Sequence, residues 1–225
     1  MSVLQLDGVW RTYGEGAAQV AALRDVTLRI DDGDFVAIVG PSGSGKSTLL
    51  QIIGLLDRPS RGTVALDGHD LEALSDQERT RLRLLTIGFV FQRFHLLAGV
   101  SAIENVALPM EAAGVPLQER YDRAAALLES VGLGDRLTFE PAQLSGGQRQ
   151  RVAIARALAN EARIILADEP TGSLHTDDTQ HVVALLRRAH REARTVIVVT
   201  HDPEVAAVAE RRLEIRDGRV QEAVS

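Results

Sequence analysis

A glycine-rich loop between two apolar runs constrains the fold of this chain more than any other feature. The run Phe35–Val39 leads into GPSGSGKS at Gly40–Ser47, and a second apolar run continues to Leu56. This pattern predicts a buried strand, a loop and a helix. The loop fits G-x-x-x-x-G-K-[ST], in which backbone N–H groups surround a phosphate chain. A glycine turn that fits by chance is the alternative, and the strand and helix patterns on its two sides argue against it.

Each part of this loop suits a polyphosphate. Glycine avoids a Cβ that would collide with phosphate oxygens, and the N-terminus of the following helix presents N–H groups and partial positive charge. Lys46 is predicted to lie over the outer phosphates, and the hydroxyl of Ser47 is predicted to ligate Mg2+. The predicted nucleotide contacts in this segment are Gly40, Pro41, Ser42, Gly43, Ser44, Gly45, Lys46, Ser47 and Thr48.

Charge and composition narrow the class of protein. The formal net charge of −6 and a pI near 5.5 lack the basic excess expected of a nucleic-acid binder, so no nucleic acid partner is predicted. Cysteine is absent, which excludes disulfides and thiolate metal sites. Neither a secretory signal nor an apolar window of membrane-spanning length is evident, so any membrane contact is predicted to be indirect or to run through a separate subunit.

Hydrophobic periodicity predicts an α/β fold. Alternating segments predict an antiparallel β layer with strands at Val3–Val9, Val26–Ile30 and Thr63–Leu66. Apolar runs predict buried strands at Thr86–Phe91, Arg163–Ala167 and Thr195–Val199. The predicted helices cover Leu71–Leu85, Glu119–Val131, Leu144–Leu158 and Asp177–Arg191, and a terminal hairpin at Arg212–Ser225 turns at Asp217-Gly218.

A single domain of 225 residues with an inserted helical part is predicted. The stretch from Ser101 to Leu144 lacks strand signals, so residues 93–144 or thereabouts are predicted to form a helical subdomain. Residues 1–92 and 145–225 are predicted to form the core with its antiparallel layer. Phe94, Leu96 and Leu97 lie in a segment expected to be exposed, where apolar side chains indicate a partner surface.

A second helix N-terminus is expected to bind an anion. The segment LSGGQRQRVAIARAL begins at Leu144, and Ser145 has the residue type and position of an N-cap. The N–H groups of the serine and the two glycines are predicted to face the anion. A capped helix with a loosened first turn is the alternative, although each glycine there costs about 1 kcal/mol relative to alanine.

Two carboxylates at a strand end are the candidate catalytic pair. Asp168 and Glu169 follow the strand Arg163–Ala167, at the edge where ligands bind in open α/β sheets. Asp168 is predicted to hold Mg2+ through water, and Glu169 to orient and deprotonate the attacking water. A pair of solvated carboxylates is the alternative.

Three further residues have two readings each. Gln92 ends a strand, where it either reaches Mg2+ and the attacking water or is a polar loop residue. His201 follows the last buried strand, where it either donates to a γ-phosphate or caps a loop. Tyr13 follows the first strand, where its ring either stacks on a nucleotide base or is a partly buried surface tyrosine.

In their order and spacing these motifs resemble the nucleotide-binding subunit of ATP-binding cassette (ABC) transporters over essentially the whole chain. The specific motifs are the loop at Gly40–Ser47, Gln92, LSGGQ at Leu144–Gln148, ILADE ending at Glu169, and His201. The resemblance implies a P-loop NTPase core with a mixed sheet, an antiparallel β subdomain and an inserted α-helical subdomain. It implies ATP hydrolysis, with ATP and Mg2+ as cofactors.

The resemblance also assigns roles to individual residues. Tyr13 looks like the adenine-stacking aromatic, Gln92 like the glutamine that senses Mg2+ and the transmembrane partner, and His201 like the switch histidine. The catalytic residues implied are Lys46, Gln92, Glu169 and His201, and the implied metal ligands are Ser47, Gln92 and Asp168.

The partners implied are a second copy of the chain and an integral membrane permease. In this family two copies pack head to tail, so that each ATP lies between one phosphate loop and the LSGGQ segment of the other copy. The resemblance therefore implies that the nucleotide held by the partner copy is bound by Ser145, Gly146, Gly147 and Gln148. The implied location is the cytoplasm, peripheral on the inner face of the cell membrane. IGFVFQRFHLL, SAIENVALP and ADEPTGSL are most similar to the macrolide-export and lipoprotein-release branch, with the cell-division ATPase a near neighbour.

One departure from the family pattern concerns His175. The family usually has aspartate at this position, in the loop after Glu169 that touches the other subunit. Histidine is not a fixed carboxylate, so communication between the two sites is expected to be altered or pH-sensitive, with Asp177 as a candidate substitute.

Two other functions fit parts of the chain. A soluble ATP-switched clamp on DNA or the ribosome would carry a long coiled coil, a zinc module or a second cassette, and the sequence has none of these. A degenerate module that does not hydrolyse ATP is disfavoured because Lys46, Asp168, Glu169 and His201 are all present.

Overall fold

The computed structural model describes residues 2–223, which divide into two compact units. The first unit joins the chain up to Arg83 with the chain from Thr195 onward, and the second spans Leu84–Arg194. The chain passes from the first unit to the second inside helix α2 (Asp76–Thr86). This division does not test the predicted helical subdomain at residues 93–144 or the predicted core at residues 1–92 and 145–225, so both stay predictions.

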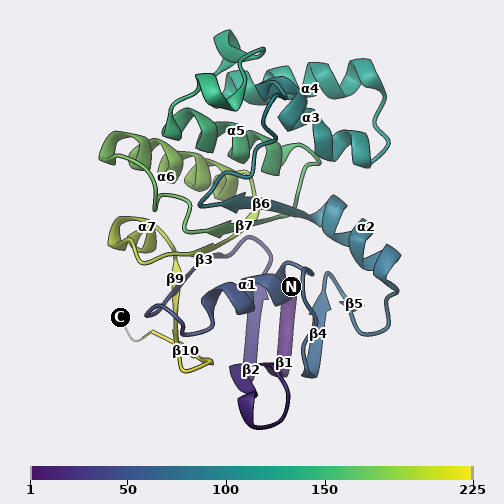
Figure 1. Ribbon diagram of the computed structural model, residues 1–225, viewed down its shortest axis with the longest axis vertical. Coiled ribbons are helices and arrows are strands. Elements are labelled where there is room, and N and C mark those ends of the chain that lie inside the picture. Colours follow the sequence, from purple (N-terminus) through teal and green to yellow (C-terminus); the bar gives the residue numbers. More distant parts are fainter. Residues whose placement is uncertain (1, 224–225) are drawn as a thin grey trace. The chain divides into compact units, whose positions relative to one another are not determined.

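The first unit contains an antiparallel sheet with strand order β2-β1-β4-β5, whose first three strands run side by side in Figure 1. The strands are β1 (Ser2–Tyr13), β2 (Val20–Asp31), β4 (Arg61–Leu66) and β5 (His69–Asp70). The predicted antiparallel layer is confirmed, but β1 continues past Gly8. Gly8 has φ +57 and lies where the register to β2 shifts between Leu6 and Val9, so this glycine forms a bulge rather than a turn.

The same unit contains four strands of a mixed sheet. β3 (Phe35–Val39) pairs in parallel with β8 (Thr195–Val199) and with β9 (Arg211–Arg216), and β10 (Arg219–Glu222) pairs antiparallel to β9. β3 and β8 are almost wholly buried, as their apolar runs predicted. The predicted terminal hairpin is confirmed up to residue 223, and residues 224–225 lie outside the described part of the chain. Helix α7 (Pro203–Ala207) follows β8 and was not predicted.

Two helix bounds differ from the prediction for local reasons. α1 (Lys46–Ile53) ends before the apolar run does, because Gly54 is its C-cap and Leu55 has φ +56. α2 begins after Ser75 rather than at Leu71. Glu78 Oε2 accepts from the Ser75 backbone N–H at 2.8 Å and from its hydroxyl at 2.6 Å, an arrangement that starts the helix at this point.

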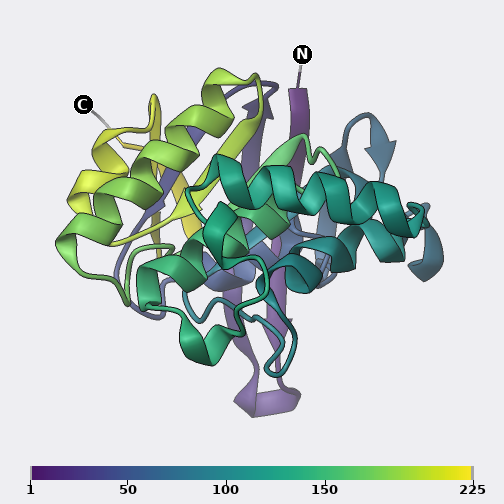
Figure 2. The ribbon, with the colours of Figure 1, turned by 90° about the horizontal axis from the view of Figure 1, so that it is seen from above.

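The second unit combines one parallel strand pair with a helical bundle. β6 (Ile87–Phe91) pairs with β7 (Ile164–Asp168). The helices are α3 (Ala102–Ala112), α4 (Leu117–Ser130), α5 (Gly146–Leu158) and α6 (Thr176–Arg191), and α3, α4 and α5 pack on one another (Figure 2). Their shared core includes Met110, Leu128 and Val152. The helical character predicted for this region is therefore confirmed.

The apolar segment expected to be exposed is partly covered. The ring of Phe94 is half-buried beneath the guanidinium of Arg149, whose Cζ lies 5.2 Å from the ring centroid. Leu96 packs against the core of α3, α4 and α5, and Leu97 is 50% exposed. Leu97 is exposed as expected, whereas Phe94 and Leu96 are half-buried, because Arg149 lies over the first and the core of α3, α4 and α5 receives the second.

Candidate functional site

The phosphate loop forms where β3 ends and α1 begins. Gly45 is the N-cap of α1 with φ +108, and a Cβ added there would overlap with the carbonyl oxygen of Ala22. A Cβ on Gly40 would overlap with the carbonyl oxygen of Ile215. These two glycines are required by the packing of the loop on neighbouring backbone as well as by any approach of a phosphate.

The polar groups of the loop are arranged to receive an anion. Lys46 Nζ donates to the carbonyl oxygens of Gly40 at 2.8 Å and Pro41 at 2.9 Å, so the ammonium lies over the loop. Ser44 is 5% exposed, and its Oγ has no hydrogen-bond partner within residues 2–223. Buried polar atoms are normally paired, so this hydroxyl indicates a ligand acceptor at the loop. Ser47, in the first turn of α1, is exposed.

His201 lies at the same sheet edge as the phosphate loop. β3 and β8 are parallel with Ile38 opposite Val199, and the N–H of the buried Thr200 donates to the carbonyl of Ile38 at 3.1 Å. This register carries His201 past the carboxyl end of β8, next to the end of β3 from which Gly40 starts. The carboxyl ends of parallel strands are where such sheets bind ligands.

Tyr13 is the last residue of β1, and its ring is held from two directions. Its hydroxyl donates to Asp57 Oδ2 at 2.9 Å, and the guanidinium of Arg11 lies 4.5 Å from the ring centroid. Asp57 Oδ2 also accepts from Arg11 Nε at 2.8 Å. The tyrosine remains 38% exposed, so a flat ligand still reaches it. Arg11 and Asp57 were not predicted, although Arg11 shares a strand face with Tyr13 at a spacing of two residues.

In the second unit Gln92 and Glu169 follow paired strand positions. Phe91 at the end of β6 lies opposite Asp168 at the end of β7, so the next residue of each strand emerges at one edge. Glu169 has φ +47, a conformation that non-glycine residues rarely adopt and that is concentrated at functional sites. A Cβ on Gly172 would lie 2.8 Å from Gln92 Nε2, so the glutamine amide contacts the loop that follows Glu169.

The Ser145–Gln148 segment begins α5 with a capping box, which confirms the predicted N-cap. Ser145 Oγ accepts from the Gln148 N–H at 3.2 Å, and Gln148 Oε1 accepts from the Ser145 N–H at 2.8 Å. A Cβ on Gly147 would overlap with the carboxylate of Asp178 at the start of α6. This glycine therefore allows α5 and α6 to approach closely, a role that the sequence did not reveal.

A buried glutamine attaches α5 to the loop after Glu169. Gln150 is fully buried, and its Nε2 donates to the carbonyl oxygen of Pro170 at 2.7 Å. The Gln150 Oε1 has no hydrogen-bond partner in the described structure. The loop after Glu169 is thus anchored to the helix that begins at Ser145, and Gln150 was not predicted as a site residue.

His175 is the N-cap residue of α6, and its side chain makes no capping hydrogen bond. Both His175 and Asp177 are exposed. Asp178, rather than Asp177, is the carboxylate that lies against the start of α5.

The predicted site residues thus form two groups, one in each compact unit. The phosphate-loop group comprises Tyr13, residues 40–48 and His201, and the carboxylate group comprises Gln92, Ser145–Gln148, Asp168 and Glu169. Within residues 2–223 no group of three or more histidine, aspartate and glutamate side chains is close enough to hold a metal ion. In the same range no helix has both the length and the apolar composition needed to cross a bilayer.

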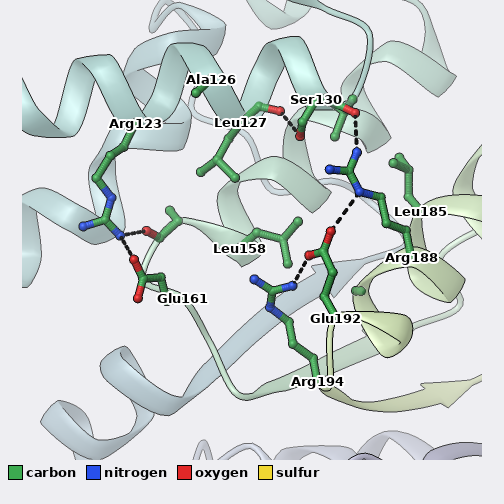
Figure 3. A pocket seen from close by; sticks show the side chains of 13 residues that line it. Arg123, Ala126, Leu127, Ser130, Leu158, Glu161, Leu185, Arg188, Glu192 and Arg194 are labelled. Carbon is green, nitrogen blue, oxygen red and sulfur yellow. Dashed lines mark hydrogen bonds and ion pairs between the residues drawn. The ribbon is translucent and has the colours of Figure 1, made fainter.

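A hollow of about 300 Å3 in the second unit contains none of these residues (Figure 3). Leucines such as Leu127 and Leu158 line it, with arginines around them. The arginines are already paired within the chain: Arg188 Nε lies 2.9 Å from Glu192, which also pairs with Arg194. The arginines among the described residues that line the hollow are thus already engaged by carboxylates of the chain, and none of them marks a ligand there.

Comparisons with known proteins agree with the motif order. The family profile described as ABC transporter matches residues 23–172. A macrolide export ATP-binding/permease protein of Hyphomonas neptunium is 51% identical over 218 residues, which cover 97% of this chain and 34% of that protein. An uncharacterized ABC transporter ATP-binding protein of Thermotoga maritima is 51% identical over 97% of this chain and 94% of its own length.

Solved structures show the same fold. The ATP-binding cassette MJ0796, in a dimeric post-hydrolysis state bound to ADP and phosphate, superposes with a TM-score of 0.90 at 44% identity, covering 98% of this chain and 97% of that one. A dimeric structure of the same cassette gives a TM-score of 0.90 at 45% identity. The predicted fold class is confirmed. The chain spans about a third of the length of the macrolide-export relatives that it matches.

Proposed function

The chain belongs to the ABC transporter family, and on that basis we propose that it is an ATP-hydrolysing subunit that dimerises on ATP and drives a membrane permease. The observation that carries this proposal is the phosphate loop. Its glycines are fixed by close backbone contacts, Lys46 lies over it, and the buried hydroxyl of Ser44 has no partner in the described structure. Such a loop at a helix N-terminus suits the phosphates of a nucleotide.

The chemistry assigned to the site is attack of water on the γ-phosphorus of ATP, with release of ADP and phosphate. Glu169 orients the water and accepts its proton, while Lys46 and the N–H groups of α1 hold the charge on the phosphates. His201 donates to the γ-phosphate. Tyr13 orients the base by stacking, and the contacts of Arg11 and Asp57 hold its ring in place for this task.

The oxygen donors of this chain suit Mg2+. The metal would be held by Ser47, Gln92 and Asp168, and it would supply positive charge to the phosphates. Mg2+ commonly takes only one or two carboxylates from protein and completes its shell with phosphates and waters. A single aspartate with hydroxyl and amide oxygens therefore fits better than a cluster of acidic residues would.

The Ser145–Gln148 segment binds the nucleotide of a second copy. Its capped helix N-terminus is a second anion site in a chain that already has one, and a head-to-tail dimer uses both sites on one ATP. The dimeric cassette structures and the ATP-binding/permease relatives support this assignment and a permease partner. The subunit then acts from the cytoplasm, on the inner face of the cell membrane.

Replacing Glu169 with glutamine tests the proposal. The amide keeps the size of the side chain but accepts no proton, so turnover is expected to fall by about 10²-fold or more. ATP binding should persist, and size-exclusion chromatography with ATP should show a trapped dimer. Near-normal turnover of the variant would mean that another group is the base.

Copurification distinguishes the transport role from a soluble clamp. The tagged chain expressed with its genomic neighbours should retain an integral membrane protein after detergent extraction. Recovery with ribosomes or DNA instead would favour the clamp.

A further inference from the structure

Two residues shortly after Gln92 adopt a backbone conformation that needs outside support. Phe94 has φ +59 and His95 has φ +48, and neither is a glycine. Consecutive left-handed residues are usually supplied by asparagine, aspartate or glycine, as at Asp217-Gly218. A phenylalanine followed by a histidine is strained in this conformation and persists only where the surrounding structure holds it. The turn that contains Gln92 is closed by a hydrogen bond, since the N–H of Phe94 donates to the carbonyl oxygen of Phe91 at 3.2 Å. Gln92 therefore lies inside a tight, strained turn.

Arg156 supplies the support. This arginine stands near the end of α5, and one of its terminal nitrogens donates to the carbonyl oxygen of Phe94 at 2.7 Å while the other donates to that of His95. The side chain is half-buried, which lowers the pKa of the guanidinium, and its hydrogen bonds go to these two carbonyl oxygens. A guanidinium that is partly withdrawn from water needs acceptors, and its planar fork suits two adjacent carbonyls.

Aromatic contacts hold the same turn from its other sides. The rings of Phe91 and His95 lie 4.7 Å apart, and Phe91 stacks on Phe89 at 5.5 Å. The guanidinium of Arg149, one residue after the Ser145–Gln148 segment, lies over the ring of Phe94. The turn is thus attached to β6 at its start and to α5 at its end.

We propose that Arg156 is a positioning residue for Gln92, whose turn it fastens to the helix that begins at the Ser145–Gln148 segment. Through this attachment the glutamine and the second anion site move as one body. The chemical consequence rests on the proposed function of Gln92, whereas the attachment itself does not. Nothing in the motif pattern assigns such a task to Arg156.

Amide hydrogen exchange of the purified chain tests the attachment directly. In Arg156→Ala the amides of residues 93–97 should exchange at least roughly tenfold faster, the effect of losing a hydrogen bond to a charged donor. Arg156→Lys should fall between this variant and wild type, since an ammonium replaces the fork by a single point charge. Exchange at wild-type rates in both variants would overturn the proposal.

Arg151 provides the matched control. It stands on the same helix and also donates to two carbonyl oxygens, those of Val131 at 2.9 Å and Gly132 at 3.3 Å, at the end of α4. Arg151→Ala should leave residues 93–97 at wild-type exchange. Equal loosening of this segment by both alanine variants would show that α5 is merely destabilised, which would refute a specific role for Arg156.

Turnover measurements join the attachment to function. We expect Arg156→Ala to lower kcat for ATP by roughly tenfold with little change in KM, because a small misplacement of Gln92 slows the chemical step. If Arg156 acts through Gln92, the double variant with Gln92→Ala should be no slower than Gln92→Ala alone. If the losses in kcat of the two single variants multiplied in the double variant, the proposal would be overturned. Normal turnover of Gln92→Ala would instead refute the assigned role of Gln92 and leave the exchange result to decide the attachment.

Discussion

Replacing Gly88 with alanine measures how tightly β6 packs against α5. A Cβ at this position would overlap with the carbonyl oxygen of Ala157 on α5 and lie 3.0 Å from Ile165 Cδ1. The obstructing atom belongs to the backbone, so no side-chain rotation removes the overlap, and strand and helix must move apart. Overpacking of this kind costs about 1–3 kcal/mol, and the lower unfolded-state entropy of alanine offsets about 0.4–1 kcal/mol. Because the overlap is with backbone, the cost lies near the upper end of this range, and after the offset we expect the free energy of unfolding to fall by about 2 kcal/mol.

Thermal unfolding followed by circular dichroism checks this value. In a chain of 225 residues, 2 kcal/mol corresponds to a loss of about 4–8 °C in Tm. Gly134→Ala is the matched control in the same unit, because the nearest atoms to an added Cβ belong to Glu129 and lie 3.5–3.6 Å away, in ordinary contact. Its Tm should change by less than about 2 °C. If Gly88→Ala lowered Tm no more than Gly134→Ala does, the packing argument would be refuted.

Two further predictions concern nucleotide binding and the contact between subunits. Lys46→Ala should weaken ATP binding by about 10- to 100-fold, the loss expected for a charged hydrogen bond, and unchanged affinity in a fluorescent-nucleotide titration would contradict the phosphate-loop assignment. His175→Asp should change the Hill coefficient of ATPase activity, because it places a fixed carboxylate in the loop predicted to touch the second copy; an identical coefficient would count against a role for His175.

Local sequence was sufficient for the parts of this protein whose structure depends on neighbours along the chain. The strand, loop and helix around Lys46 follow from one apolar run, one glycine pattern and a second apolar run. The N-cap at Ser145 follows from a serine placed three residues before a glutamine. The strand ends near Asp168, Glu169 and His201 were also predicted from local sequence, because a buried strand is recognised by its short apolar run.

Errors of the sequence reading arose where two local signals compete. Gly8 has the features of a turn, yet the pairing of β1 with β2 and β4 absorbs it as a bulge. The apolar run after Lys46 continues to Leu56, yet Gly54 ends the helix directly after the buried Ile53. Pairing with neighbouring strands decided the first case and a helix cap decided the second. Hydrophobic periodicity alone reports neither kind of hydrogen bonding.

Tertiary contacts alone decided how the candidate site is held together. Arg156 meets the carbonyls of Phe94 and His95 across about sixty positions of sequence, and Gln150 meets that of Pro170 across twenty. An arginine four residues after the buried Val152 was a faint signal of the first contact, because that spacing places it on the inward face of a helix. The acceptors could not be predicted from sequence, because every residue has a backbone carbonyl. Only the folded chain determines which carbonyl the half-buried guanidinium of Arg156 or the buried amide of Gln150 reaches.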